Sequence, residues 1–341
     1  MKSLLLPPLS ALYGIITRSR TALYQRGAFR TTKLPRPVIS IGNITTGGTG
    51  KTPLVEWVAR VLADSGKRVC ILTRGYGREN PERRVLVSDG TTVFSNALEA
   101  GDEPFLLARN LSGVAVISDA DRVSAAQGAI KHLSTDCFVL DDGFQHLQLA
   151  RDLNIVTIDA TNPWGGREML PYGRLREPLS GLKRADCIVL TRSEHVNDVE
   201  AISSEIASLS GDRPIFRSRM RTKKVTPLLD EISPARLPKI VGAFCAVGNP
   251  ESFFAHLRQD GYELVMQRSF RDHHVYTHDD VATLVSAARQ AGASSLITTA
   301  KDAVKLGEFS FGVPCYSLEI EIDIENEEDL RRLVLESSSV S

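Results

Sequence analysis

The most informative segment of the chain is a run of glycines and threonines that contains one lysine: Thr45-Thr46-Gly47-Gly48-Thr49-Gly50-Lys51-Thr52. It follows an apolar run at 38–41 and precedes a helix predicted at 53–65. A glycine-rich turn between a strand and a helix is typical of a phosphate-binding loop. Backbone N–H groups surround the phosphates, the lysine reaches the β and γ oxygens, and the hydroxyl faces Mg²⁺. The usual pattern has a glycine where Thr45 stands. A plain glycine-rich turn, the alternative, needs neither Lys51 nor Thr52, so we expect a nucleotide site.

Composition is that of a soluble globular protein. A length of 341 residues suggests about two domains. The chain is 42% hydrophobic and 24% charged, which is enough for a full core. Its 5 cysteines are scattered singly, and this favours a reducing compartment without disulfides or structural zinc. We expect no nucleic-acid partner and no obligate protein partner.

The first part of the chain is cationic although the net charge is +0. The first acidic residue is Glu56. The basic residues before it are Lys2, Arg18, Arg20, Arg26, Arg30, Lys33, Arg36 and Lys51. The arm 1–33 begins with an apolar segment at 4–16, which is too short for a transmembrane helix of about 20 residues and contains Pro7-Pro8. It also lacks the A-x-A-like cleavage site of a signal peptide.

Two interpretations of this arm remain. Apolar residues recur at helical spacing, and arginines follow them, as in a helix that lies on an anionic membrane surface. These apolar residues are Leu5, Leu9, Leu12 and Ile16. The alternative is a helix that packs on the protein's own core, with its basic residues in solvent. The first interpretation predicts a peripheral membrane protein.

Strand-like and helix-like segments alternate along the chain. Strands are predicted at 38–41, 69–73, 114–118, 137–140, 154–158 and 187–191, with helices at 53–65, 103–109 and 121–133. This alternation predicts an α/β fold with a mostly parallel sheet covered on both faces. We expect a phosphate-loop (P-loop) core domain at 34–212, a connector at 213–238, a smaller C-terminal α/β domain at 239–325 and an acidic, Ser-rich tail at 326–341.

A second chemical site follows the predicted strand at 137–140. Asp141 and Asp142 stand at its carboxyl end, where ligands bind in open α/β sheets. A hydrophobic strand ending in aspartate beside a phosphate loop is the arrangement in which a carboxylate holds Mg²⁺. A plain turn with solvated acids is the alternative. Because a phosphate loop is already present, we interpret both aspartates as metal ligands, whereas His146 either orients a phosphate or packs locally.

Further polar clusters are denser than a scaffold requires. Tyr76 lies between two arginines in a glycine-rich turn, which suits an anionic ligand. Asp102 opens a helix and is either a cap or a carboxylate at the ligand edge. Arg122 follows a strand and adds positive charge. Asp272-His273-His274 is not spaced for a metal, because adjacent side chains diverge.

Taken in order, these motifs resemble the tetraacyldisaccharide 4′-kinase family, also called the lipid A 4′-kinases. The matching segments, spread over about 4–318, are GNITTGGTGKTP, LTRGYGR, GDEP, DADR, LDDGFQH, GRLREPL, FRDHH and TTAKDAVKL. The resemblance implies transfer of the γ-phosphate of ATP to the 4′-hydroxyl of a tetraacylated glucosamine disaccharide 1-phosphate. It also implies a P-loop core, a smaller second domain and an N-terminal helix at the cytoplasmic face of the inner membrane.

The resemblance implies roles for particular residues. Lys51 and Thr52 match the phosphate-loop lysine and the Mg²⁺-site hydroxyl, and Asp141 and Asp142 match the acidic pair near the metal. Asp102 matches the proposed catalytic aspartate, and His273 the histidine thought to act with it. Further active-site positions are matched by Arg122, Tyr76 and His146.

Two other classes of protein stay open. One is a membrane-associated nucleotide switch, an ATPase or GTPase; such loops often read K-G-G-x-G-K-T, and here Thr46 occupies the lysine's place. The guanine motif N-K-x-D is only approximated, at 299–302. The other class is a kinase of a soluble small molecule, which would not need the apolar, cationic arm.

Overall fold

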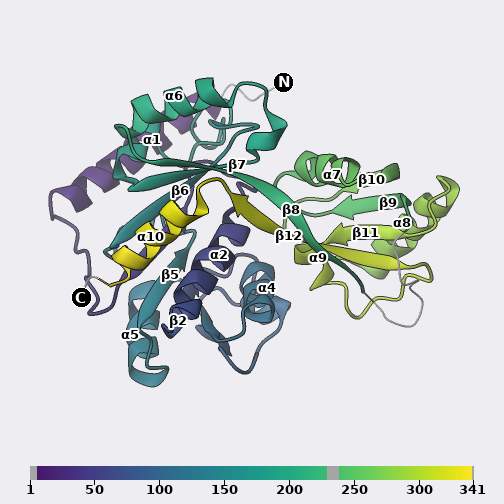
Figure 1. The fold of residues 1–341 in the computed structure, drawn as a ribbon, viewed down its shortest axis with the longest axis horizontal. Coiled ribbons are helices and arrows are strands. Elements are labelled where there is room, and N and C mark those ends of the chain that lie inside the picture. The colour runs from purple at the N-terminus through teal and green to yellow at the C-terminus, as the bar shows by residue number, and fades with distance from the viewer. Residues whose placement is uncertain (1–5, 229–237, 340–341) are drawn as a thin grey trace.

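The computed structural model describes residues 6–228 and 238–339 and shows a larger and a smaller lobe (Figure 1). The larger one, here the core lobe, is built on a sheet with the strand order β7-β6-β1-β5-β2-β4-β3. These strands are β1 (Val38–Gly42), β2 (Val69–Thr73), β3 (Val85–Asp89), β4 (Val114–Ser118), β5 (Cys137–Asp141), β6 (Leu153–Asp159) and β7 (Cys187–Thr191). All pairs are parallel except the one between β3 and β4, at the edge. This confirms the predicted α/β fold with a mostly parallel sheet.

Helices cover both faces of this sheet because both faces of its central strands are apolar. In β2, Ile71 belongs to one buried cluster, and Cys70 and Leu72 belong to another on the opposite face. Such two-sided burial is expected of parallel strands. The helices are α2 (Lys51–Asp64), α3 (Ala97–Ala100), α4 (Asp102–Asn110), α5 (Arg122–His132) and α6 (Val199–Ser210), with 3-10 turns η1 (Leu179–Arg184) and η2 (Ser193–His195).

The second lobe is a smaller α/β unit. Three of its strands, β9 (Ile240–Cys245), β10 (Glu263–Ser269) and β11 (Leu296–Thr299), run parallel to one another. Its helices are α7 (Pro250–Gln259), α8 (His278–Gln290) and the short α9 (Ala300–Ala303). The last strand, β12 (Cys315–Ile324), pairs in parallel with β11.

Most of the described part of the connector expected at 213–238 is a strand. β8 (Ile215–Pro227) pairs with β7 at its start and runs antiparallel to β12 along the rest. Among the described residues, β8 therefore joins the strands of both lobes into one 12-stranded sheet. Residues 229–237 lie outside the described part. The many basic residues of β8 obscured its strand character, since they are the exposed side of a long two-stranded ladder.

The tail predicted at 326–341 contains a helix that returns to the core lobe. α10 (Glu327–Ser337) lies beside α2 (Figure 1). Leu330 and Val334 are fully buried in the same cluster as Leu54. Trp57 Nε1 donates to Glu327 Oε1 at 2.8 Å. The chain thus leaves the core lobe through β8, returns through β12 and closes on α2.

The N-terminal arm contains helix α1 (Leu6–Gln25), which contacts the core lobe along one side. Ser10 and Gly14 are its buried residues, and Tyr13 Oη donates to the carbonyl of Arg176 at 3.1 Å. The predicted apolar positions face outward: Leu9, Leu12 and Ile16 are each at least 50% exposed; Leu5 lies outside the described residues. No helix in the described ranges has the length and apolar character needed to cross a membrane.

Candidate active site

The carboxyl ends of the parallel strands of both lobes open onto one cavity of about 660 Å³. From the core lobe come the loop after β1, the ends of β2 and β5, and residues after β7. From the second lobe come residues after β9, β10 and β11. Ligands bind in open α/β sheets at this edge. All eight residues of the loop 45–52 line the cavity.

The loop is held in place by hydrogen bonds from the neighbouring strands. Thr191 Oγ1 donates to the carbonyl of Thr49 at 3.0 Å, and Arg192 donates to the carbonyl of Gly48 at 2.7 Å. Gly50 has φ 76°, which favours glycine, directly before α2 begins at Lys51. The backbone N–H groups at the start of α2 are therefore available for an anion.

Thr45 replaces the usual first glycine because its backbone pairs like a strand. It forms an isolated antiparallel bridge with Leu175 and is 5% exposed. The next residue continues the contact, since Thr46 N donates to the carbonyl of Arg174 at 2.8 Å. A β-branched residue suits such an extended, buried position.

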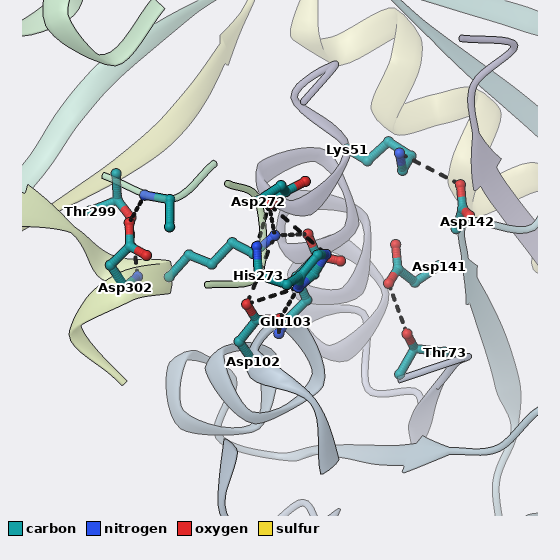
Figure 2. Close-up of polar contacts among 12 residues, drawn as sticks. Lys51, Thr73, Asp102, Glu103, Asp141, Asp142, Asp272, His273, Thr299 and Asp302 are labelled. Carbon is teal, nitrogen blue, oxygen red and sulfur yellow. Dashed lines mark hydrogen bonds and ion pairs between the residues drawn. The ribbon is translucent and has the colours of Figure 1, made fainter. Parts of the chain in front are cut away.

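Two carboxylates stand at the end of β5, as predicted, but in different environments. Lys51 Nζ lies 3.5 Å from Asp142 Oδ1, and Thr73 Oγ1 donates to Asp141 Oδ2 at 2.9 Å (Figure 2). Burial, helped by the negative charges of Glu103 and Asp142, raises the pKa of Asp141 to about 6. Burial also opposes ionisation of Asp142, but Lys51 and Arg176 outweigh it and hold the pKa of Asp142 below its usual range.

This donor set fits Mg²⁺. The cation is bound in phosphoryl-transfer sites by one or two carboxylates together with waters and substrate phosphates. Asp141 is a buried carboxylate whose pKa is raised partly by like charges, and a cation would relieve this repulsion. Thr52 lines the same cavity from the first turn of α2. Within the described ranges no group of three or more His, Cys, Asp and Glu side chains forms a metal site by itself.

Asp102 and His273 come from different lobes and meet beside the cavity. His273 Nδ1 lies 3.1 Å from both carboxylate oxygens of Asp102, although 171 residues separate them (Figure 2). The hydrogen bond to Asp102 raises the pKa of His273. Burial raises the pKa of Asp102, yet His273, Lys301 and Lys305 together bring it below its ordinary value. The pair is thus set up to share a proton between an imidazole and a carboxylate.

Two of these residues have strained backbones. Asp142 has φ 52° and His273 has φ 60°, in the left-handed region that non-glycine residues rarely adopt. Each such residue costs about 1 kcal/mol or more. Strain of this kind persists where the surrounding structure over-determines it, commonly at functional sites.

Arg122 and His146 are close to the carboxylate pair but do not line the cavity. Arg122 donates to the carbonyl of Asp141 at 3.3 Å, and its other terminal nitrogen lies 3.3 Å from His146 Nδ1. Burial, with the nearby arginines, lowers the pKa of His146 to about 3, so its imidazole is neutral. Tyr76 is 66% exposed, and its ring centroid lies 5.6 Å from that of His273.

The second lobe touches the phosphate loop directly. A side chain at Gly248 would place its Cβ 2.7 Å from the backbone nitrogen of Gly48, so only glycine allows this approach. Asn249 Nδ2 donates to Asp159 Oδ2 at 3.1 Å. Contacts between the lobes therefore involve the loop as well as the Asp102–His273 pair.

Two further charged residues of the site lie in segments that match the family but had no role predicted for them individually. Arg176 NH1 donates to Asp142 Oδ1 at 2.6 Å, beside Lys51. Lys301 Nζ donates to Glu103 Oε1 at 3.0 Å across the lobes. Lys301 comes directly after Thr299 and Ala300 at the carboxyl end of β11, so the strand-end rule applied to the second lobe could have identified it.

Fold and site together define a P-loop protein of the α/β class, with the glycine-rich loop and His273 lining one cavity. The sequence matches the model of the family described as tetraacyldisaccharide-1-P 4′-kinase over residues 2–339. The chain belongs to this family.

Individual relatives agree with this assignment. The tetraacyldisaccharide 4′-kinase of Geobacter metallireducens is 45% identical over 307 residues, covering 89% of this chain and 88% of the relative. That of Desulfotalea psychrophila is 40% identical, covering 91% and 90%. A crystal structure of LpxK from Aquifex aeolicus in complex with ATP has a TM-score of 0.75 and 33% identity, covering 97% of this chain and 98% of that one.

Proposed function

We propose that the protein is an ATP-dependent kinase that phosphorylates the 4′-hydroxyl of a tetraacyl glucosamine disaccharide 1-phosphate in lipid A biosynthesis. Family membership and the names of its relatives support the substrate. The solved ATP complex of the Aquifex aeolicus relative supports the donor. The observation that carries the chemistry is the Asp102–His273 pair, held across the lobes beside the phosphate loop.

In this proposal the loop 45–52 binds the triphosphate through its backbone N–H groups, and Lys51 contacts the β and γ oxygens. Thr52, Asp141 and Asp142 would hold Mg²⁺, which when bound neutralises negative charge on the phosphates. Arg122 adds positive charge behind the carboxylate pair, and His146 contacts Arg122 there. Tyr76 lines the cavity beside His273.

Asp102 accepts the proton of the 4′-hydroxyl as that oxygen attacks the γ-phosphorus. The bond between the γ-phosphorus and the β–γ bridging oxygen breaks, and ADP leaves. His273 shares or relays the proton, because an aspartate with an ordinary pKa of about 3.9 is a weak base by itself. Since His273 belongs to the second lobe, transfer requires the lobes to be together.

A transfer assay tests the function directly. We expect ³²P to pass from γ-labelled ATP to the disaccharide 1-phosphate with the wild-type protein, and transfer to fall by about 10²–10⁴-fold in Asp102→Ala. Asp64→Ala, at an exposed position near the end of α2, is the matched control. If the wild type transferred no phosphate, the function would be wrong; full activity in Asp102→Ala would overturn only the role of that residue.

We also propose that α1 holds the protein at the cytoplasmic face of the inner membrane. Its outward apolar residues and the exposed arginines at 18, 20, 26 and 30 suit an anionic lipid surface. The double variant Leu12→Asp/Ile16→Asp should lose co-flotation with anionic vesicles but keep activity on a detergent-dispersed acceptor. Leu98→Asp, at a 57% exposed leucine of α3, is the control. Unchanged co-flotation of the double variant would refute the membrane role of α1.

A further inference from the structure

Lys301 lies between three carboxylates that belong to both lobes. Its Nζ is 3.0 Å from Glu103 Oε1, 3.2 Å from Asp272 Oδ1 and 4.0 Å from Asp102 Oδ2. Only 14% of the Lys301 side chain is exposed. Glu103 and Asp102 belong to the core lobe, whereas Asp272 and Lys301 belong to the second lobe.

The two bonded partners of Lys301 are the sequence neighbours of the proton-sharing pair. Glu103 directly follows Asp102, and Asp272 directly precedes His273 (Figure 2). Lys301 therefore joins the backbone segment that carries the carboxylate to the segment that carries the imidazole. A side chain that joins two such neighbours restricts the distance and the angle between the pair itself.

The turn that carries Lys301 is itself fixed. Asp302 is fully buried; its Oδ2 accepts hydrogen bonds from Ala246 N at 3.0 Å and from Thr299 Oγ1 at 2.7 Å. Lys305 Nζ lies 3.0 Å from Asp302 Oδ1. Since Ala246 follows β9, the turn after β11 is anchored to the neighbouring strand. A site residue carried by such a fixed turn is held more precisely than one on a free loop.

The charged groups around the pair come from three segments. They are Glu103 on α4, Asp272 beside His273, and Lys301 and Lys305 from α9 and the residues after it. Burial opposes the charge of Lys301, but Glu103, Asp102 and Asp272 outweigh it and raise the pKa of Lys301, which stays an ammonium. Its positive charge in turn acts to lower the pKa of both Asp102 and His273.

We propose that Lys301 is a positioning residue for phosphoryl transfer, which ties Glu103 to Asp272 and so holds His273 against Asp102. This inference rests on the proposed kinase function. Lys301 acts through its two carboxylate partners and takes no proton itself. Its loss should lower kcat more than it raises KM for ATP, because the nucleotide contacts of the loop 45–52 stay in place.

Two measurements on Lys301→Met test this role. First, we expect kcat at pH 7 to fall about tenfold, with KM for ATP within about twofold of wild type. Without the ammonium, and with a weaker hydrogen bond to His273, the pKa of Asp102 rises, so the acid limb of the pH–rate profile moves to higher pH. Lys301→Arg, which keeps the charge and can bridge both carboxylates, should regain most of the activity. Lys239→Met, at a second-lobe lysine paired with the Asp260 carbonyl, is the control.

The second measurement does not depend on kinase activity. The imidazole resonances of His273 are followed by NMR against pH in the wild type and in Lys301→Met. We expect the pKa of His273 to be lower in the variant, because a looser pair weakens the hydrogen bond to Asp102 that raises it. A wild-type kcat and pH profile in Lys301→Met, or an unchanged His273 titration in a folded variant, would overturn the inference. Absence of transfer by the wild type would instead overturn the proposed function, and the NMR result would still decide whether Lys301 acts on the pair.

Discussion

The site has two corners that are built in contrasting ways. The phosphate corner, with Lys51, Asp142 and the loop 45–52, comes wholly from strand ends of the core lobe. The proton corner, with Asp102 and His273, exists only where the two lobes meet. In the proposed function the core lobe therefore binds the phosphates, whereas the second lobe completes the proton-transfer pair. The variants below test this division.

Lys51→Met should have the largest effect, because it removes the only phosphate-loop side chain that carries charge. We expect kcat/KM for phosphate transfer to fall by about 10³-fold, with weaker ATP binding. Steady-state transfer kinetics and a nucleotide-binding titration measure the two effects. Lys131→Met, at an exposed lysine of α5, should behave as the wild type. Wild-type ATP affinity in Lys51→Met would contradict the account of the phosphate corner.

Matched leucine deletions compare the stability of the lobes. Leu330→Ala truncates a fully buried side chain of α10 in the core lobe. Leu284→Ala truncates a 2% exposed side chain of α8 in the second lobe. Each should lower the free energy of unfolding by about 3 kcal/mol. Both tryptophans, Trp57 and Trp164, belong to the core lobe, so their fluorescence reports on that lobe alone.

Urea titrations followed by tryptophan emission and by far-UV circular dichroism distinguish a loss of stability in the core lobe from one in the second lobe. Leu330→Ala should shift the tryptophan transition to lower urea. Leu284→Ala should shift the circular-dichroism transition more than the tryptophan one. An unshifted tryptophan transition in Leu330→Ala would show that α10 does not stabilise the core lobe.

Gly248→Val tests the contact between the second lobe and the phosphate loop. A Cβ at this position would overlap the backbone of Gly47 and Gly48, so the lobes must separate slightly. A misplacement of about 1 Å costs on the order of 10²-fold in rate, and we expect a loss of about 10–100-fold in kcat/KM. Gly307→Ala, with open space around it, is the control. A wild-type rate in Gly248→Val would mean that this contact plays no part in closure.

The smallest effect expected is a pH-dependent gain in stability from the Asp102–His273 pair. The pKa of Asp102 is lowered on folding, so its contribution is present above the ordinary aspartate pKa and is lost as pH falls. The pKa of His273 is raised, so its contribution is present below the ordinary histidine pKa and is lost as pH rises through the folded value. The gain is therefore largest between about pH 4 and pH 6.5.

Thermal melts of the wild type and His273→Gln across pH measure this gain. The difference in Tm should be about 2 °C at pH 5–6 and should shrink toward pH 9. A difference that grew with pH would contradict the assignment of a charged pair.

Much of the core lobe could be predicted because its signals are local. Strands at 69–73, 114–118 and 187–191 were predicted with the bounds that the structure shows. β3 was missed because it is an edge strand in which Leu86 is exposed and the last two residues, Ser88 and Asp89, are polar. β8 was interpreted as a connector because its basic residues conceal the pattern of a strand paired on both sides.

Part of the site could also be predicted from local sequence signals. Lys51, Asp141 and Asp142 follow strands, so the strand-end rule places them together. The partners of Lys301 and Arg176 could not be predicted, since they lie in distant segments that only the tertiary structure brings close. The pairing of Asp102 with His273 came from a family resemblance, because a separation of 171 residues gives no local signal.

A double-mutant cycle on Asp102 and His273 tests most directly whether the two lobes share one proton-transfer unit. The measured quantity is kcat for ³²P transfer in Asp102→Asn, His273→Gln and the double variant, at saturating ATP. Residues that act as a unit are strongly non-additive. We expect the double variant to be about as slow as the slower single variant. Losses that multiply in the double variant would show that the two residues act independently, and would contradict the account.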